Sequence, residues 1–211
     1  MKKTAIEKNI EYSNKFIQPI KNPVVPLEIK EIIEKEKVKS LIDLGCGDGI
    51  LIHAIKRGFP KIKITGIDIS PRRINGLKEK FSEGKFYVRD VCNTKIKKKF
   101  DLVYSSQVIE HVSSDEKMVI EIARLLKKNG ILFCSSVVKK RWAIYKYRNN
   151  GKFVLDPTHE KEYKTPKEFL DLFKKDFNLI NCSISQTSRR KFGIQIKIPG
   201  FYEIQGVWRK R

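Results

Sequence analysis

Three glycines and two acids occupy one short stretch of the sequence, and their types point to ligand binding. The stretch DLGCGDG covers residues 43 to 49, between the apolar runs VKSLI and ILIHAI. The first run is typical of a buried strand and the second has helical spacing, so the glycines lie at a strand-to-helix turn. Glycine lets a ligand approach the backbone more closely than any Cβ atom would allow. We therefore expect a ligand-binding loop here.

Polar residues also follow the next three predicted strands. Asp68 ends the run KIKITGID, Asp90 ends KFYVRD, and Ser106 and Gln107 end KFDLVYSSQ. In an open α/β sheet, ligands bind beyond the carboxyl ends of the parallel strands. Asp68 follows Gly45 by about 20 positions, where a carboxylate can accept hydrogen bonds from the hydroxyls of a ribose. The pattern predicts a ligand that contains a nucleoside.

NAD is the first alternative for such a site. A dinucleotide fingerprint, G-x-G-x-x-G, uses its third glycine for close helix packing beneath a pyrophosphate. This chain has Gly45, Gly47 and Gly49, with Ile50 where that third glycine would stand. Asp48 at the start of the helix would also repel two phosphates. The loop favours a nucleoside ligand without phosphate, although a nicotinamide-dependent oxidoreductase stays an alternative.

Strands and helices alternate along the part of the chain that must position these residues. Helical patterns at 4–17 and 27–37 precede five strands, and the helix at 114–128 is closed by Asn129-Gly130. Alternation of this kind implies parallel pairing through right-handed crossovers. Two last strands, FNLINCSIS and GFYEIQGVWRK, are separated by too few residues for a helical crossover, so we expect them to be antiparallel. The predicted fold is α/β, with a doubly wound, Rossmann-like seven-stranded sheet that is mostly parallel, an antiparallel last strand and helices on both faces.

We expect a single domain over residues 1–211, because this length is typical of one globular unit. It divides into four predicted parts: a helical preface (1–37), a cofactor-binding core (38–136), an insertion that covers the substrate (139–165), and a C-terminal part with a helix from 165–166 to about 175 and two strands (166–211).

The composition indicates a basic intracellular protein. The formal net charge is +21, but the lysines are spread through nearly every segment, so binding of nucleic acid is one interpretation and a solvated surface is the other. The four cysteines form no C-x-x-C pair, and no apolar run approaches the roughly 18 residues of a membrane span. The basic start lacks an apolar segment behind it, so we expect no signal peptide and a cytoplasmic location.

Five segments in order carry a family resemblance: LIDLGCGDGILIHAI, ITGIDIS, FYVRDV, FDLVYSSQVIEHV and ARLLKKNGILFCSS. Together they resemble the successive motifs of class I S-adenosylmethionine-dependent methyltransferases, and are most similar to the small-molecule branch that includes quinone-biosynthesis methylases. The resemblance covers residues 38–136, and more loosely 159–211. It implies S-adenosylmethionine as the cofactor, with Asp68 binding the ribose hydroxyls and Asp90 the adenine amino group. The other cofactor-binding residues that it implies are Asp43, Gly45, Cys46, Gly47, Gly49, Ile69, Val91, Ser106 and Gln107.

Two histidines are candidate catalytic residues. His111 follows Glu110 in QVIEHV, and His159 lies in DPTHEKEY. Either could be a general base or a substrate contact, and packing within the fold is the alternative for both. The segments also resemble the E-x-x-E-H motif and later histidine with which methyltransferases of the 3′-terminal ribose of small RNAs hold a metal. Gln107 replaces the first glutamate and an amide is a poorer ligand than a carboxylate, so we expect no metal.

The resemblance implies methyl transfer to an unidentified acceptor. We expect a small molecule, because no recognised RNA-binding module is appended, and we expect it to enter beneath residues 139–165 and the N-terminal helices. A general base is optional, since the sulfonium already makes the methyl group electrophilic. An RNA methyltransferase that uses the basic surface and a non-catalytic nucleic-acid-binding protein stay alternatives.

Overall fold

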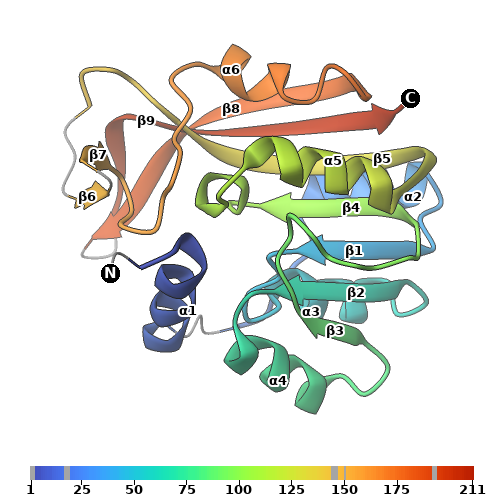
Figure 1. Ribbon diagram of the computed structural model, residues 1–211. Helices are drawn as coiled ribbons and strands as arrows, with labels where there is room; N and C mark the ends of the chain where they lie inside the picture. Colours follow the sequence, from blue (N-terminus) through green and yellow to red (C-terminus); the bar gives the residue numbers. More distant parts are fainter. Residues whose placement is uncertain (1–2, 17–19, 144–146, 150, 192–193) are drawn as a thin grey trace.

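The computed structural model describes residues 3–16, 20–143, 147–149, 151–191 and 194–211, and contains a seven-stranded sheet (Figure 1). The strand order is β3-β2-β1-β4-β5-β9-β8. The first five strands of this sheet pair in parallel, whereas β9 is antiparallel to both β5 and β8. The predicted fold class is confirmed. The strands of this sheet are β1 (Ser40–Leu44), β2 (Lys63–Asp68), β3 (Lys85–Val88), β4 (Phe100–Ser106), β5 (Leu126–Lys139), β8 (Phe177–Lys191) and β9 (Ile194–Lys210).

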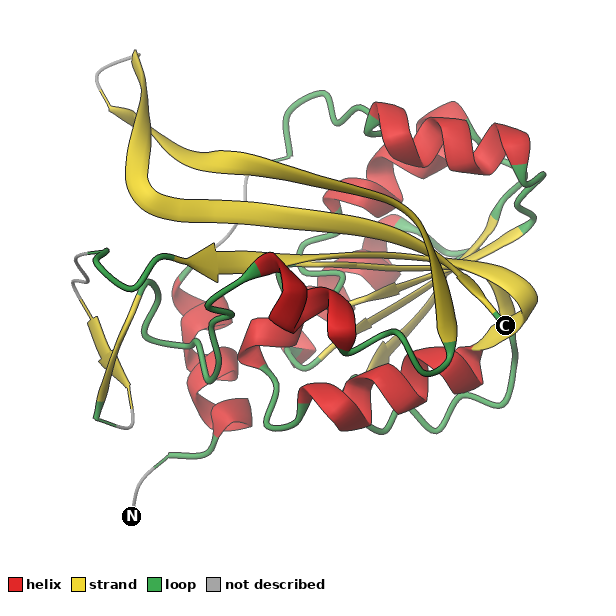
Figure 2. Ribbon diagram, turned by 90° about the horizontal axis from the view of Figure 1, so that it is seen from above, coloured by secondary structure: helices red, strands yellow, loops and turns green. Residues whose placement is uncertain are grey.

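Helices cover both faces of the sheet, as the view along it shows (Figure 2). They are α1 (Ala5–Lys15), α2 (Leu27–Lys35), α3 (Ile50–Gly58), α4 (Pro71–Lys80), α5 (Asp115–Leu125) and α6 (Pro166–Asp171), with a short 3₁₀ helix, η1 (Ile109–His111). Strand alternation divides the core between the two faces. Ile42 packs in one cluster with α5 and α6, whereas Leu41 packs in the other with α2, α3 and α4.

The strand order reverses between β1 and β4, and this point sets the position of the site. From β1 the chain moves outward through β2 to β3, then returns to β4 on the other side of β1. Loops that leave β1 and β4 therefore diverge and open a crevice at their carboxyl ends. Figure 1 shows α1 beyond the arrowheads of β1, β2 and β4, so this helix closes the crevice.

The helix predicted to run to residue 128 ends earlier, at Leu125. The buried side chain of Leu126 already pairs with Phe100 as the first residue of β5, and reaching this place in the core requires an extended backbone. Asn129 then adopts a positive φ of 60° inside the strand. The Asn129-Gly130 pair therefore marks an irregularity within β5 rather than the end of a helix.

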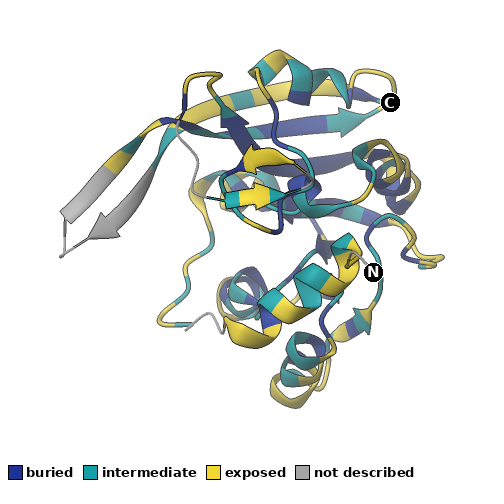
Figure 3. Cartoon of the chain, turned by 60° about the vertical axis from the view of Figure 1, so that its left-hand side comes forward, coloured by how far each residue is buried: buried dark blue, intermediate teal, exposed yellow. Residues whose placement is uncertain are grey.

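The C-terminal strands are longer than predicted and pair with each other as one antiparallel hairpin (Figure 3). The indole of Trp208 packs against Gly206 of β9, where no larger residue fits, because a Cβ atom on Gly206 would lie 2.2 Å from the ring. Trp208 packs against Phe173, with ring centroids 4.3 Å apart. The helix predicted to reach residue 175 ends at Asp171.

The insertion contains a small hairpin that sequence analysis did not predict, formed by β6 (Tyr147–Asn149) and β7 (Lys152–Val154). Lys8 of α1 donates to Asn149 Oδ1 at 2.8 Å and pairs with Glu160 at 3.1 Å. The segment after β7 then returns to the main sheet, where Tyr163 bridges to Val138. The insertion and α1 therefore lie side by side near the crevice.

Candidate cofactor and substrate site

The glycine loop after β1 has a conformation that needs glycine. Gly45, Gly47 and Gly49 have φ values of 76°, 57° and 87°. The amides of Gly45 and Cys46 both donate to the Ile67 carbonyl, at 2.7 and 2.9 Å, which folds the loop against β2. A Cβ atom on Gly45 would lie 2.3 Å from a methyl carbon of Val108, whereas one on Gly47 would meet nothing within 4 Å. The loop is packed on one side and open beside Gly47.

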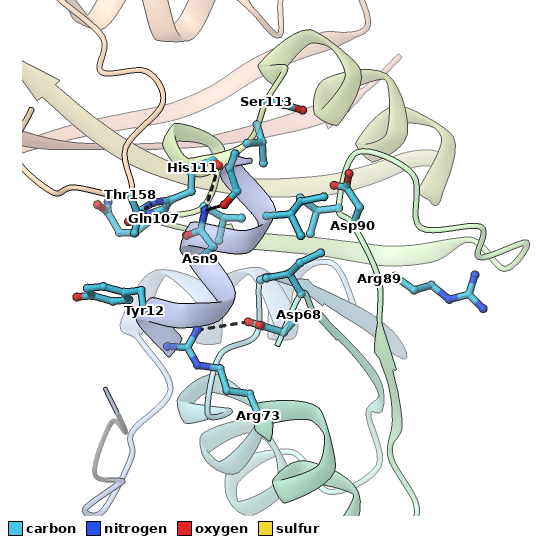
Figure 4. A pocket seen from close by; sticks show the side chains of 17 residues that line it. Asn9, Tyr12, Asp68, Arg73, Arg89, Asp90, Gln107, His111, Ser113 and Thr158 are labelled. Atoms are coloured by element: carbon cyan, nitrogen blue, oxygen red, sulfur yellow. Dashed lines mark hydrogen bonds and ion pairs between the residues drawn. The ribbon is translucent and has the colours of Figure 1, made fainter. Parts of the chain in front are cut away.

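Asp68 links this loop to the start of α4. Its carboxylate accepts from the Gly47 amide at 2.9 Å and from the Ser70 amide at 2.8 Å. Arg73 lies 3.7 Å from it, as the dashed line in Figure 4 shows. The side chain is buried and lines a cavity. Two amide bonds leave carboxylate lone pairs for a ligand, because an ionised carboxylate offers about four acceptor positions.

Asp43 is a buried acid near the loop. Burial, and to a smaller extent the charge of Asp68, raise its pKa to about 8. No donor from the described residues forms a hydrogen bond with its carboxylate. A buried acid in this state is stabilised by an approaching cation, and the expected cofactor carries an ammonium group. Together, the bare loop and the acids at 43 and 68 fit S-adenosylmethionine.

A cavity of about 240 Å³ lies between the strand ends and α1 (Figure 4). Seven of the predicted site residues line it: Gly45, Asp68, Ile69, Asp90, Val91, Gln107 and His111. Asp90 accepts from the Cys92 amide at 2.8 Å, which fixes the turn after β3. Gln107 has a φ of 55° and its side-chain amide donates to Ser135 Oγ at 3.3 Å.

The other predicted residues lie outside the lining of this cavity. Cys46 is buried beneath the loop, where burial raises the pKa of its thiol well above the usual value. Gly49 is the N-cap of α3. The Ser106 hydroxyl bonds to Ser135 Oγ at 2.9 Å. The cofactor contacts of all the predicted residues, inside and outside this lining, stay predictions.

Sequence analysis assigned no residue of α1 to the site. Four of its residues, Ala5, Ile6, Asn9 and Tyr12, line the cavity. Asn9 reaches across to the His111 carbonyl at 3.4 Å (Figure 4). The helical pattern predicted at 4–17 located this helix, and Thr4 and Glu7 form a capping box at its start. Arg73, Arg89 and Thr158 also line the cavity, and no sequence pattern distinguished them from other polar residues.

The two candidate histidines lie together, with ring centroids 4.7 Å apart. His111 lines the cavity, whereas His159 is buried behind it. Burial lowers the pKa of His111 to about 4 and raises that of the adjacent Glu110 to about 7. Burial also lowers the pKa of His159, but the hydrogen bond to Glu162 and the nearby carboxylates raise it overall. Whether either histidine is catalytic stays a prediction.

Comparisons with known proteins agree with this geometry. A family model described as a methyltransferase domain matches residues 35–187. The chain is 31% identical over 192 residues to a ubiquinone biosynthesis O-methyltransferase of Pelagibacter ubique (strain HTCC1062), covering 82% of this chain and 78% of that protein. It is 28% identical to a malonyl-acyl-carrier-protein O-methyltransferase of Ilyobacter polytropus, covering 69% of this chain but only 55% of the relative.

The fold is shared with solved structures at lower identity. TehB from Haemophilus influenzae aligns with a TM-score of 0.68 at 14% identity, covering 97% of this chain and 67% of that one. The family model spans most of the chain, and the Pelagibacter relative matches most of both lengths. The chain therefore belongs to the class I S-adenosylmethionine-dependent methyltransferases.

Proposed function

We propose that this methyltransferase acts on an oxygen atom of a small-molecule acceptor that binds between the strand ends and α1. The cavity enclosed by α1 is the observation that carries the proposal. S-adenosylmethionine, when bound, supplies an electrophilic methyl group. The protein must align the acceptor with this methyl group and exclude water from the site. The helix α1, which lies across the crevice, contributes to both tasks.

Residues on two sides of the cavity would divide this work. Asp43, Asp68 and the glycine loop would hold the cofactor against the ends of β1 and β2. Asn9 and Tyr12 of α1, with His111 across from them, would contact the acceptor. The choice of oxygen is supported by the two relatives described above, whose names both describe O-methyltransferases.

The position of the basic charge favours a small acceptor over RNA. Burial and the nearby charges of Lys63, Lys85 and Lys127 lower the pKa of Lys98, so these four ammonium groups lie close together. Lys63 and Lys85 begin β2 and β3, at the edge of the sheet opposite the cavity. These lysines lie at the opposite ends of the strands from the cavity. This arrangement supports a role for the charge that is separate from acceptor binding.

A cytoplasmic location completes the proposal. All four cysteines are free thiols, which supports a reducing compartment. Among the described helices, none is both long and apolar enough to cross a bilayer.

Calorimetric titration with S-adenosylmethionine and S-adenosylhomocysteine tests the cofactor site. We expect Asp68→Asn to bind both weakly and Asp101→Asn to bind them normally. Asp101 is a matched control, because it also accepts from two backbone amides, of Lys39 and Ser40, but at the opposite end of β1. Equal affinity in the two variants would contradict the role of Asp68.

Methyl transfer to candidate acceptors tests the substrate class. Small hydroxylated and carboxylated molecules, and a short RNA, are incubated with the protein and S-adenosylmethionine that carries a labelled methyl group. The proposal expects label on an oxygen of a small acceptor. Label on RNA alone would overturn it and favour the nucleic-acid alternative.

A further inference from the structure

A second cavity, of about 580 Å³, lies between α3, α4 and residues 20–23. Four cationic side chains line it: Arg57 of α3, and Arg72, Arg73 and Lys80 of α4. Asp48 is the single carboxylate among the described residues of this lining, which therefore carries a formal charge of +3. A concave surface with charge of one sign attracts ions of the opposite sign.

Helical spacing brings these side chains together from two helices. Arg72, Gly76 and Lys80 follow one another at intervals of four residues, so they share one face of α4. His53 and Arg57 have the same interval on α3. All five residues line the second cavity. The cavity is therefore formed where one face of each helix meets the other.

Gly76 keeps the second cavity open. It lies in the interior of α4, where glycine is less favourable than alanine. Neither packing nor backbone conformation requires glycine here, since a Cβ atom on Gly76 would meet nothing within 4 Å and its φ is not positive. A larger side chain at this position would occupy space that a ligand could fill.

The protein satisfies the cations of the second cavity only in part. Arg73 Nε is buried without a hydrogen-bond partner among the described residues. The Arg73 guanidinium lies 3.7 Å from Asp48 and 3.7 Å from Asp68, and both distances are too long for hydrogen bonds. Asp48 also lies 3.1 Å from Arg72, so two guanidinium groups share this one carboxylate. An anion in the cavity would supply the acceptor that Arg73 Nε lacks.

His53 adds a second donor without an acceptor. Its Nε2 is buried and has no hydrogen-bond partner in the part of the chain that the structure describes. Burial lowers the pKa of His53 and the charge of Lys80 lowers it further, so the ring is neutral at pH 7. A neutral imidazole with its proton on Nε2 donates to an anion. Phe81 holds the ring in place by an edge-on contact, with centroids 4.6 Å apart.

We propose that the second cavity binds the phosphate group of a small phosphorylated molecule. Guanidinium groups donate in pairs to phosphate oxygens, and a lysine ammonium adds a point charge. A phosphate monoester carries about 1.5 to 2 negative charges at pH 7, which the lining can balance. The volume lies within the range of about 300–1,000 Å³ that is typical of small-molecule sites, so the cavity also accommodates an organic group attached to the phosphate.

Calorimetric titration of the full chain with inorganic phosphate and with glycerol 3-phosphate tests the site. Chloride keeps the ionic strength constant, because salt screens exposed charges. We expect one phosphate group per chain, and Arg57→Gln and Lys80→Gln should each weaken binding about 10-fold. Lys78→Gln is the matched control, because it removes the same charge from an exposed position on α4 outside the cavity. It should bind phosphate normally.

Gly76→Glu distinguishes loss of the site from loss of the fold. The new carboxylate would lie four residues from both Arg72 and Lys80 and pair with them on the face of α4. We therefore expect circular dichroism to show a higher melting temperature than in wild type. The same carboxylate would fill the cavity and repel phosphate, so phosphate binding should be lost.

Three results would overturn the proposal. The first is the absence of saturable phosphate binding, or binding that persists in Gly76→Glu or weakens equally in Lys78→Gln. The second is displacement of phosphate by S-adenosylhomocysteine, which would place the phosphate in the cavity beside α1. The third is binding of a short RNA without binding of glycerol 3-phosphate, which would assign these cations to a nucleic-acid surface.

Discussion

At the residue scale, Asp43 should make the stability of the protein depend on pH. Its pKa is about 8 in the folded protein, against an ordinary value of 3.8. Between these values the folded state binds a proton that the unfolded state has released, so this group lowers stability as pH rises from about 4 to 8. We expect Asp43→Asn to remove this slope and to gain stability relative to wild type at pH 8.

Thermal melts from pH 5 to 9 without cofactor check this prediction. The difference in melting temperature between Asp43→Asn and wild type should grow with pH and become constant above about pH 8. Asp101→Asn provides the comparison, because hydrogen bonds from Lys127 and Ser40 outweigh burial and lower the pKa of Asp101. A constant difference across the whole range for Asp43→Asn would show that Asp43 is ionised in the folded protein.

Alanine substitutions at Gly47 and Gly45 should distinguish the cost of backbone strain from the cost of a steric overlap. Alanine at position 47 meets open space, so Gly47→Ala should destabilise the protein only by the strain of a positive φ, about 1–2 kcal/mol. Gly45→Ala has the same strain and also overlaps Val108, which adds about 1–3 kcal/mol. Urea unfolding measures both values. A loss of stability in Gly45→Ala no greater than in Gly47→Ala would contradict the tight contact with Val108.

Sequence reasoning located the residues that stand at strand ends, because strand topology alone brings those positions together. Asp68, Asp90 and Gln107 follow different strands, yet all three line the cavity. It could not locate Arg73 or Thr158, since their roles depend on how α4 and the insertion pack. The contact between His159 and His111 could not be predicted for the same reason. The two residues are 48 positions apart in the sequence, and they come together only because the insertion returns to the sheet.

At the scale of elements, Arg72 should control the position of α1. Its Nε and Nη2 donate to the Ser13 carbonyl at 3.1 and 2.8 Å, and Nη2 also contacts Asp48 at 3.1 Å. The guanidinium therefore fastens the last turn of α1 to α4 and the glycine loop. We expect Arg72→Ala to leave the melting temperature nearly unchanged, because α1 lies outside both hydrophobic cores.

Hydrogen exchange measures the release of α1. Exchange over residues 5–15 should become faster in Arg72→Ala, and cofactor affinity should fall as the cavity loses its cover. Lys78→Ala is a suitable control, since Lys78 is an exposed basic residue on α4, the helix that also carries Arg72. Unchanged exchange in Arg72→Ala would show that other contacts, such as Asn9 with His111, are enough to hold the helix.

The elements themselves were predictable to the extent that local pattern decides them. Prolines and caps marked the starts of α4 and α6, where Ser70 and Thr165 bond to the backbone as N-caps. The predicted end of α5 was wrong because Leu126 pairs with Phe100 as part of β5. Phe100 is distant in sequence, so local pattern does not indicate this contact. The length of the final hairpin likewise depends on pairing between its own strands, which local composition does not encode.

At the scale of the whole molecule, both hydrophobic clusters should unfold together. β1, β4, β5 and β9 each contribute side chains to both faces of the sheet, so neither cluster persists without these strands. Trp208 is buried in one cluster, whereas Trp142 is 66% exposed. In Trp142→Phe, fluorescence therefore reports on Trp208 alone, while far-ultraviolet circular dichroism reports on helices of both faces.

We expect the two signals to give the same urea midpoint and slope in this variant, as in a two-state transition. Adding Gly206→Ala should shift both midpoints equally to lower urea, because the new Cβ atom displaces the Trp208 ring from its place beside Phe173. A fluorescence transition that precedes the loss of helix would show that the face carrying α5 and α6 unfolds first. The face carrying α2, α3 and α4 would then be stable alone, and the shared strands would not couple the two cores.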